Sequence, residues 1–299
     1  MSESKEKTSV GAIVGILIFF FIVFFLVAGA VFAMVSGEEQ VGERLGVVEV
    51  TGTIESADST VKSIREFSED EQIRGILIRV NSPGGSVSAS QEIVEAIRSI
   101  QKPVVISMGD MAASGAYYVS CAGPTIYASA GTLTGSIGVI SQVLEFKDVI
   151  DFLKLKVHTV KTGDLKDAGS PYREFNETDK VYFTELGLEI LDQFVSHVAE
   201  ARHLPKEKVM SLADGRVWTG RQALKLGLID EIGGFGDAID ALKKEAGIQD
   251  KAVLVYPKRA SDDLLLSLIE NGATEVTHGI AAGARDVLNA PRSFMYLYK

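Results

Sequence analysis

The chain has 299 residues, of which 46% are apolar and 23% charged, and its formal net charge at pH 7 is −10. This length suffices for one large or two smaller domains with a hydrophobic core. The acidic balance argues against nucleic acid as a partner and offers no basic patch for anionic lipid. The single cysteine, Cys121, excludes an internal disulfide, and we expect it to be a small buried apolar group.

The N-terminal part of the chain contains a long apolar stretch. Residues 8–37 carry no charged side chain. A helix of that length spans about 45 Å, whereas the hydrocarbon core of a bilayer is about 30 Å thick. We therefore predict a transmembrane anchor at residues 10–36. A cleaved signal peptide is the alternative, because small residues that suit a signal peptidase follow the apolar run: Ala28, Ala30 and Ala33.

The charges that flank this stretch predict its orientation. Lys5 and Lys7 precede it, and a polar linker at residues 37–44 contains the next basic residue. The positive-inside rule then predicts that residues 1–9 are cytoplasmic. The protein is expected to cross the cell membrane once and to hold its larger, C-terminal part on the outer face.

Beyond the linker, apolar stretches of strand length alternate with amphipathic stretches of helical length. This alternation predicts an α/β domain of parallel strands with right-handed crossovers at residues 45–260, followed by a helical tail at residues 261–299. The predicted strands are 45–54, 75–80, 104–108, 125–128, 155–160 and 252–256. The predicted helices are 59–67, 86–100, a short helix from residue 114, 174–202, 206–213, 220–226 and 236–246.

Three turns after predicted strands could carry chemistry, because ligands gather beyond the carboxyl ends of parallel strands; they are residues 81–85, 109–115 and 161–171. The turn at residues 81–85 ends in Gly84 and Gly85, whose N–H groups could point at an anion, although an ordinary β-turn is the commoner use of this sequence. Ser114 opens the short helix and is either a nucleophile or an N-cap. Its surroundings lack the Gly-x-Ser-x-Gly elbow of α/β-hydrolases, which disfavours that family.

A nucleophilic serine needs a base, and histidine is the first candidate. His158 lies in the predicted strand at residues 155–160 and stays an alternative. His197 and His203 belong to a predicted helix and its end, where we expect solvated or capping roles. His278 lies in the C-terminal tail.

Lys166, in the turn after that strand, is the second candidate. A lysine acts as a base near pH 7 only if its pKa falls from about 10.4 to about 7, which requires about 4–5 kcal/mol of destabilisation of the ammonium. Burial against apolar surface can supply this, and Ser136 could orient the amine. Because a lysine in a loop is usually a solvated charge, spacing alone leaves its role open.

Several segments in one order resemble the signal peptide peptidase A family, the protease IV family of Ser–Lys peptidases. The resemblance covers residues 45–245 and implies a ClpP/crotonase-like fold of stacked β-β-α units. The segments are residues 81–85, 111–115, 132–139, 166–171, 214–223 and 227–230.

The resemblance also implies roles for individual residues. Ser114 would be the nucleophile, Lys166 the general base and Ser136 the residue that holds the lysine amine. The N–H groups of Gly85 and Gly115 would form the oxyanion hole. No metal or cofactor is implied.

The family further implies a substrate class and an assembly. Cleaved signal peptides and other unfolded hydrophobic peptides would be degraded inside a ring-like homo-oligomer, held to membrane lipid by the anchor. The chain resembles the short, single-domain form, so every catalytic group is expected from one copy. Ala116 departs from the second glycine of many relatives.

Two alternatives remain open. A crotonase-type enzyme acting on acyl-CoA would share the fold, because the pattern of residues 223–230 recurs there. A catalytically silent membrane scaffold could also keep the fold. Loss of hydrolysis on mutation of Ser114 and Lys166 distinguishes a peptidase from both.

Overall fold

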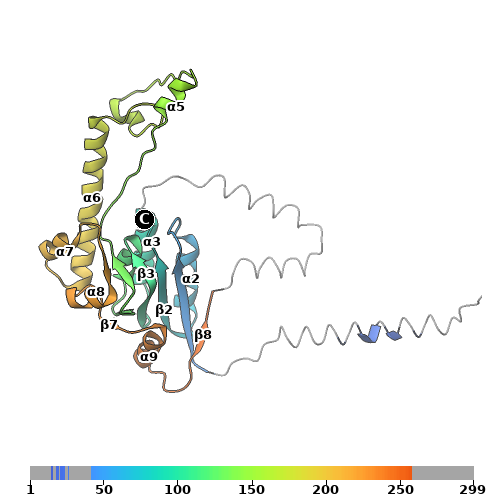
Figure 1. Cartoon of the computed structure of the whole chain (residues 1–299). Coiled ribbons are helices and arrows are strands. Elements are labelled where there is room, and N and C mark those ends of the chain that lie inside the picture. Colours follow the sequence, from blue (N-terminus) through green and yellow to red (C-terminus); the bar gives the residue numbers. More distant parts are fainter. Residues whose placement is uncertain (1–14, 16–17, 20, 24–25, 27–41, 258–299) are drawn as a thin grey trace, which may run out of the picture. The chain divides into compact units, whose positions relative to one another are not determined.

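The computed structural model describes residues 42–257 and, ahead of them, only residues 15, 18, 19, 21–23 and 26 (Figure 1). The compact unit begins at Gly42. The predicted tail at residues 261–299, and the predicted anchor at residues 10–36 apart from those few positions, lie outside the described residues. Among the residues that are described, no helix is both long enough and apolar enough to cross a membrane.

One mixed sheet of eight strands organises this unit, in the order β6-β5-β3-β2-β1-β8, with β4 pairing to β3 and β7. All pairs are parallel except β5 with β6. The predicted α/β fold with a parallel sheet is confirmed. The strands are β1 (Arg44–Thr51), β2 (Ile73–Ser82), β3 (Val104–Ala113), β4 (Ile126–Ala128), β5 (Leu133–Gly135), β6 (Val217–Thr219), β7 (Glu231–Ile232) and β8 (Val253–Val255).

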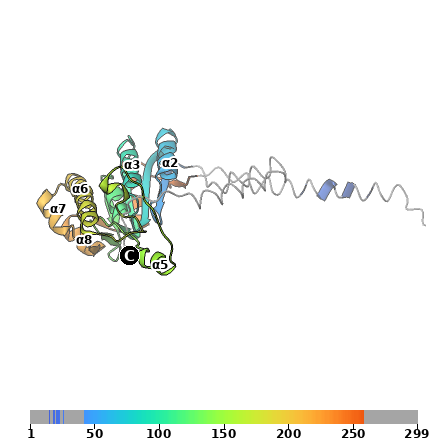
Figure 2. The ribbon, with the colours of Figure 1, turned by 90° about the horizontal axis from the view of Figure 1, so that it is seen from above.

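Helices cover both faces of the sheet. On one face α2 and α3 lie side by side, as Figure 2 shows, and α3 also contacts α4, which contacts α6. On the other face α9 contacts β2 and β3. The helices are α2 (Asp58–Glu69), α3 (Val87–Arg98), α4 (Gly115–Ser120), α5 (Lys147–Phe152), α6 (Glu177–Arg202), α7 (Lys206–Leu212), α8 (Gly220–Leu226) and α9 (Phe235–Glu245), with a 3₁₀ turn η1 at Asp164–Asp167.

The central strands are apolar on both faces, as this layering requires. Along β2, Ile76, Ile78 and Val80 belong to the larger core cluster, whereas Leu77 belongs to the smaller cluster beneath α9. Successive side chains of a strand point to opposite faces, so a strand between two helical layers has a continuous apolar sequence. The two clusters fix β2 and β3 as the rigid centre of the molecule.

Some sequence predictions were wrong. Residues 155–160 are irregular rather than a strand, and their alternation faces solvent, since Val160 is 99% exposed. Strand β3 continues to Ala113, into the turn predicted at residues 109–115, because β5 pairs with its second half. The helix α5, the 3₁₀ turn η1 and the short strands β5, β6 and β7 were not predicted.

His197 was also wrongly predicted. It is buried rather than solvated, with its Nε2 2.9 Å from the Tyr118 carbonyl and its Nδ1 3.1 Å from an Arg98 guanidinium nitrogen. The bond that the guanidinium donates leaves Nδ1 as acceptor and Nε2–H as donor. His203, in contrast, is the C-cap of α6 as expected. Cys121 is buried, which confirms its apolar role.

Candidate active site

Ser114 stands between the end of β3 and the start of α4. Its backbone has φ = 55° and ψ = −123°, a conformation that residues other than glycine rarely adopt. The residue is 2% exposed. Strained positions persist only where the surroundings over-determine them, and they gather at functional sites.

Hydrogen bonds from the neighbouring strand hold this conformation. The Ser114 N–H donates to the Gly135 carbonyl (2.8 Å), and the Tyr118 N–H donates to the Ser114 carbonyl (2.9 Å). Nearer the start of these two strands, where Ala112 of β3 is paired with Thr134 of β5, Thr134 Oγ1 donates to the Ala112 carbonyl (2.7 Å). Ser114 is therefore fixed by β5 as well as by its own strand and helix.

Ser136 occupies the corresponding position after β5. It has φ = 49° and follows Gly135, whose φ is 78°. Its N–H donates to the Arg216 carbonyl (2.9 Å), and its hydroxyl donates to the Gly215 carbonyl (3.1 Å). A side chain at Gly135 would lie 2.7 Å from Cδ1 of Trp218, so the antiparallel β5–β6 pair requires glycine there.

A cavity of about 370 Å³ opens beside these turns. The structure brings Ser114 and Ser136 together on its wall. Asp214 and Gly215, which precede β6, were not predicted as site residues, although their segment had contributed to the family resemblance. The lining residues are Ser114, Ser136, Gly138, Val139, Ile140, Leu191, Ala213, Asp214 and Gly215.

Asp214 is the one carboxylate on this lining. Hydrogen bonds from the Arg216 side chain hold the pKa of Asp214 below its usual value. The same guanidinium lies over the Trp218 ring, 5.4 Å from its centroid. The carboxylate stays ionised at neutral pH and its partner holds it at the cavity edge.

The two glycines predicted for an oxyanion hole are both buried. Gly115 is the first residue of α4, where an N–H group has no intrahelical acceptor. Gly85 bridges to Ile54, but the bonds of this bridge run from Ile54 N–H to Gly84 and from Ser86 N–H to Ile54. The Gly85 N–H is thus not used by the bridge. A side chain at Gly85 would collide with the Ile54 carbonyl.

Lys166 lies elsewhere, exposed on η1. It is not on the wall of the Ser114 cavity. The preceding Leu165 lines a separate groove with the first turns of α6, including Val181, whereas Leu191 of the same helix lines the Ser114 cavity. Ten residues of helix separate Val181 from Leu191, which is about 15 Å. The described chain therefore does not bring Lys166 into the cavity with the two serines.

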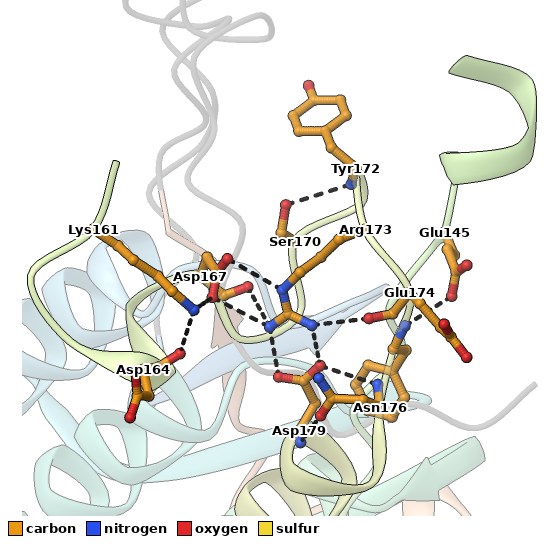
Figure 3. A network of polar contacts seen from close by, with 11 residues as sticks. Glu145, Lys161, Asp164, Asp167, Ser170, Tyr172, Arg173, Glu174, Asn176 and Asp179 are labelled. Carbon is orange, nitrogen blue, oxygen red and sulfur yellow. Dashed lines mark hydrogen bonds and ion pairs between the residues drawn. The ribbon is translucent and has the colours of Figure 1, made fainter. Parts of the chain in front are cut away.

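The segment that carries Lys166 is here called the arm, residues 141–176. It contains α5 and η1 and lies at the opposite end of α6 from α7 and α8 (Figure 1). His158 is also in the arm, exposed and irregular. The groups around η1 form a network of ion pairs centred on Arg173 (Figure 3).

Two hydrogen-bonded carboxylates in this network, Asp167 and Asp179, have lowered pKa values. Hydrogen bonds from Lys161 and then Arg173 lower the pKa of Asp167. A bond from Arg173 lowers the pKa of Asp179, and the two carboxylates together raise the pKa of Arg173. Among the described residues, no group of three or more His, Cys, Asp or Glu side chains could hold a metal ion.

Comparison with known proteins places these features in a family. The model of peptidase family S49 matches residues 96–249, and a Clp protease model matches residues 43–130. Over 196 residues the chain is 38% identical to the "Putative signal peptide peptidase SppA" of Enterococcus faecium, covering 64% of this chain and 57% of that protein. Over 272 residues it is 33% identical to Protease 4 of Haemophilus influenzae, covering 87% and 44%.

A third relative is the chloroplastic serine protease SPPA of Arabidopsis thaliana, 33% identical over 224 residues that cover 73% of this chain and 33% of that protein. The chain thus spans about half the length, or less, of these curated relatives. The S49 model accounts for just over half of the 299 residues. The chain therefore belongs to peptidase family S49, and its resemblance to signal peptide peptidase A is confirmed.

Proposed function

We propose that the protein is a serine endopeptidase with a Ser–Lys dyad, which degrades cleaved signal peptides and other unfolded hydrophobic peptides. The observation that carries this proposal is the strained, buried conformation of Ser114 on a cavity shared with Ser136. A serine on a sharp strand-to-helix turn is a recurrent way to present a nucleophile. The names of the relatives support a peptidase.

The reaction is acyl transfer. Neutral Lys166 accepts the proton of Ser114, whose oxygen attacks the carbonyl of the scissile peptide. The Gly85 and Gly115 N–H groups stabilise the oxyanion. Lys166 then protonates the leaving amine, and with a water molecule it later hydrolyses the acyl-enzyme. Ser136 holds the lysine amine in place.

This mechanism needs Lys166 to be buried, because an exposed ammonium gains nothing from losing its proton at pH 7. Two arrangements can bury it. The arm can close over the cavity of its own chain, which keeps the dyad within one copy as the family resemblance implies. Alternatively, the arm of one copy can reach the Ser114 cavity of a neighbour.

The arm has an apolar surface that supports assembly. Its exposed apolar side chains include Leu144 (72%), Phe152 (83%), Leu153 (57%) and Val160 (99%). Exposed apolar side chains that gather in one segment suit an interaction site better than single scattered ones do. We place it between copies in a ring-like homo-oligomer, with hydrophobic peptides entering the enclosed sites.

Residues 10–36 are proposed as a single-pass anchor in the cell membrane, with residues 1–9 cytoplasmic and the peptidase domain on the outer face. The support is the uncharged stretch at residues 8–37 and the preceding lysines. Added protease should digest the domain in intact spheroplasts. Digestion only after permeabilisation would reverse the orientation.

The activity is tested with Ser114→Ala and Lys166→Ala, using casein and a synthetic signal-peptide fragment as substrates. We expect each variant to lose hydrolysis by about 10⁴-fold or more, since residues of a catalytic unit act together. Ser99→Ala, at the C-cap of α3, and Lys62→Ala, on α2, are the control variants and should keep wild-type rates. Unchanged hydrolysis in either dyad variant would refute the dyad.

Two further outcomes separate the remaining alternatives. An intact protein without any hydrolysis would indicate a silent scaffold, and turnover of acyl-CoA thioesters would indicate a crotonase-type enzyme. Mixing Ser114→Ala with Lys166→Ala subunits then locates the dyad. Recovered hydrolysis shows that the two residues come from different copies, and its absence places them in one copy.

A further inference from the structure

The network in Figure 3 is centred on the Arg173 guanidinium, which contacts two separate elements. Its Nη1 and Nη2 donate to the two carboxylate oxygens of Asp179 (2.5 and 2.7 Å). Its Nη2 also donates to the Asp167 carbonyl (3.0 Å), and its Nε lies 3.2 Å from the Asp167 carboxylate. A forked pair of this kind fixes both position and orientation.

The two carboxylates belong to the two elements that Arg173 connects. Asp179 is part of the capping box of α6, in which Asn176 Oδ1 accepts from the Asp179 N–H (3.0 Å) and the Asp179 carboxylate accepts from the Asn176 N–H (3.2 Å). Asp167 is the last residue of η1 and follows Lys166 directly. One side chain therefore ties the start of a 26-residue helix to the turn that carries the predicted base.

The network is buried enough for these ties to matter. The side chain of Asp179 is 2% exposed, that of Asp167 13% and that of Arg173 27%. A carboxylate with little contact to solvent is destabilised when it loses a cation, so the three groups constrain one another. Solvent-exposed ion pairs elsewhere on the surface lack this constraint.

Lys161 closes the turn from the other side. Its ammonium donates to the Asp167 carboxylate (2.8 Å) and to the Asp164 carbonyl (2.9 Å). The carboxylate beside Lys166 is thus shared by two cations, which agrees with its lowered pKa. Lys166 itself makes no ion pair and no side-chain hydrogen bond with any described residue. The ionisable groups around the turn are Lys161, Asp164, Asp167, Arg173, Glu177, Asp179 and Glu185.

We propose that Arg173 is a positioning residue for Lys166: it clamps η1 to the start of α6 and occupies the neighbouring Asp167 carboxylate. The clamp keeps Lys166 at a fixed place on the arm. Together with Lys161 it also keeps Asp167 from pairing with the Lys166 ammonium, which would stabilise the protonated form and oppose its action as a base. This inference rests on the proposed Ser–Lys function.

The test compares Arg173→Gln and Arg173→Lys in the full-length protein, with the signal-peptide fragment as substrate. In Arg173→Gln we expect kcat to fall about 100-fold, since small misplacements of catalytic groups have effects of this size, while KM stays within about 3-fold. The acidic limb of its kcat/KM profile should move to higher pH, because Asp167 then has one cation, Lys161, in place of two and can also attract the Lys166 ammonium.

Arg173→Lys keeps the positive charge but loses the two parallel hydrogen bonds that the guanidinium donates to Asp179. Its kcat should therefore fall only about 10-fold, and its pH profile should match the wild type. Lys206→Gln is the matched control. It removes the cation of another ion pair that involves α6, in which the ammonium of Lys206, at the start of α7, lies 2.6 Å from the Asp192 carboxylate of α6. It should leave kcat, KM and the pH profile unchanged.

A wild-type kcat and pH profile in Arg173→Gln would overturn the proposal, as would an equal effect of Lys206→Gln. A lower melting temperature with unchanged kcat per folded molecule would reduce the network to a structural role and also overturn it. Where Arg173→Gln does not fold, Arg173→Lys decides: lower kcat at constant KM supports the clamp, and wild-type kcat refutes it. Hydrolysis that survives Ser114→Ala and Lys166→Ala instead refutes the underlying function and the clamp with it.

Discussion

The sheet that carries Ser114 and the arm that carries Lys166 are stabilised in different ways. Ser114 and Ser136 are 2% and 6% exposed, and strand pairing and backbone hydrogen bonds fix both. The arm has one short helix, many exposed apolar side chains and a network of ion pairs around η1. The site of the proposed nucleophile is thus preformed by the fold. In the proposed mechanism, Lys166 needs a covering surface before it can lose its proton.

Replacing Ser114, the proposed nucleophile, with glycine tests whether its backbone conformation is strained. Ser114→Gly should abolish hydrolysis, by about 10⁴-fold or more. Because glycine adopts φ = 55° freely, this variant should be about 1–2 kcal/mol more stable than Ser114→Ala. Urea unfolding of both variants measures the difference. Equal stabilities would show that the conformation of Ser114 is not strained.

A methyl group at Gly135 tests how far the second serine depends on β5–β6 packing. Gly135 has φ = 78°, and the new Cβ would lie 2.7 Å from Trp218. Gly135→Ala should lower the free energy of unfolding by about 2–4 kcal/mol and reduce kcat by displacing Ser136. Gly131→Ala, in the turn before β5 and with nothing within 4 Å of its Cβ, is the control. Similar losses in both variants would contradict the role of Trp218.

The same contrast explains what the sequence could predict. The apolar stretches of β1, β2 and β3 are buried on both faces of the sheet. The length of each apolar stretch and the period of its pattern were therefore sufficient to predict these strands. The glycine turns and Ser114 follow such strands and were found with them. In the arm, the alternation at residues 155–160 has no strand beside it to pair with, and the pattern alone predicted a strand that does not form.

The candidate site shows a second limit. Asp214 and Gly215 reach the cavity only because β6 pairs antiparallel with β5, a contact between residues about 80 positions apart that no local pattern signals. His197 was assigned to solvent because α6 is amphipathic, yet Tyr118 and Arg98 provide polar partners inside the core. Long-range partners, rather than local propensity, determine where these three residues lie.

Acid should destabilise the core around His197 and the ion-pair network of the arm at different pH values. Burial lowers the pKa of His197, so the unfolded chain binds its proton more readily than the native protein does. Its contribution to stability is complete above its unfolded pKa, about 6.5, and is lost as pH falls below that value. Asp167 and Asp179 also have lowered pKa values, so the arm network loses stability only as pH falls below about 4.

We therefore expect the free energy of unfolding to fall between pH 7 and pH 5 because of His197. The groups that face it are Arg98 of α3, Tyr118 of α4 and Glu200 of α6. His197→Gln can keep the bond to the Tyr118 carbonyl and should flatten this dependence in urea titrations. The exposed His158→Gln should not alter it. A wild-type slope in His197→Gln would assign the acid sensitivity to other groups.

The smallest effect on folding is expected from the apolar tip of the arm. Phe152→Ser and Leu153→Ser replace side chains that are 83% and 57% exposed, so the free energy of unfolding of a single chain should change by less than about 0.5 kcal/mol. If copies cover this surface, the pair of substitutions should nevertheless lower the mass found by sedimentation velocity and reduce hydrolysis. Asp148→Ser, on the same helix, is the polar control. Unchanged mass with unchanged hydrolysis would mean that the tip is not part of the assembly, and the surface that buries Lys166 would have to come from its own chain.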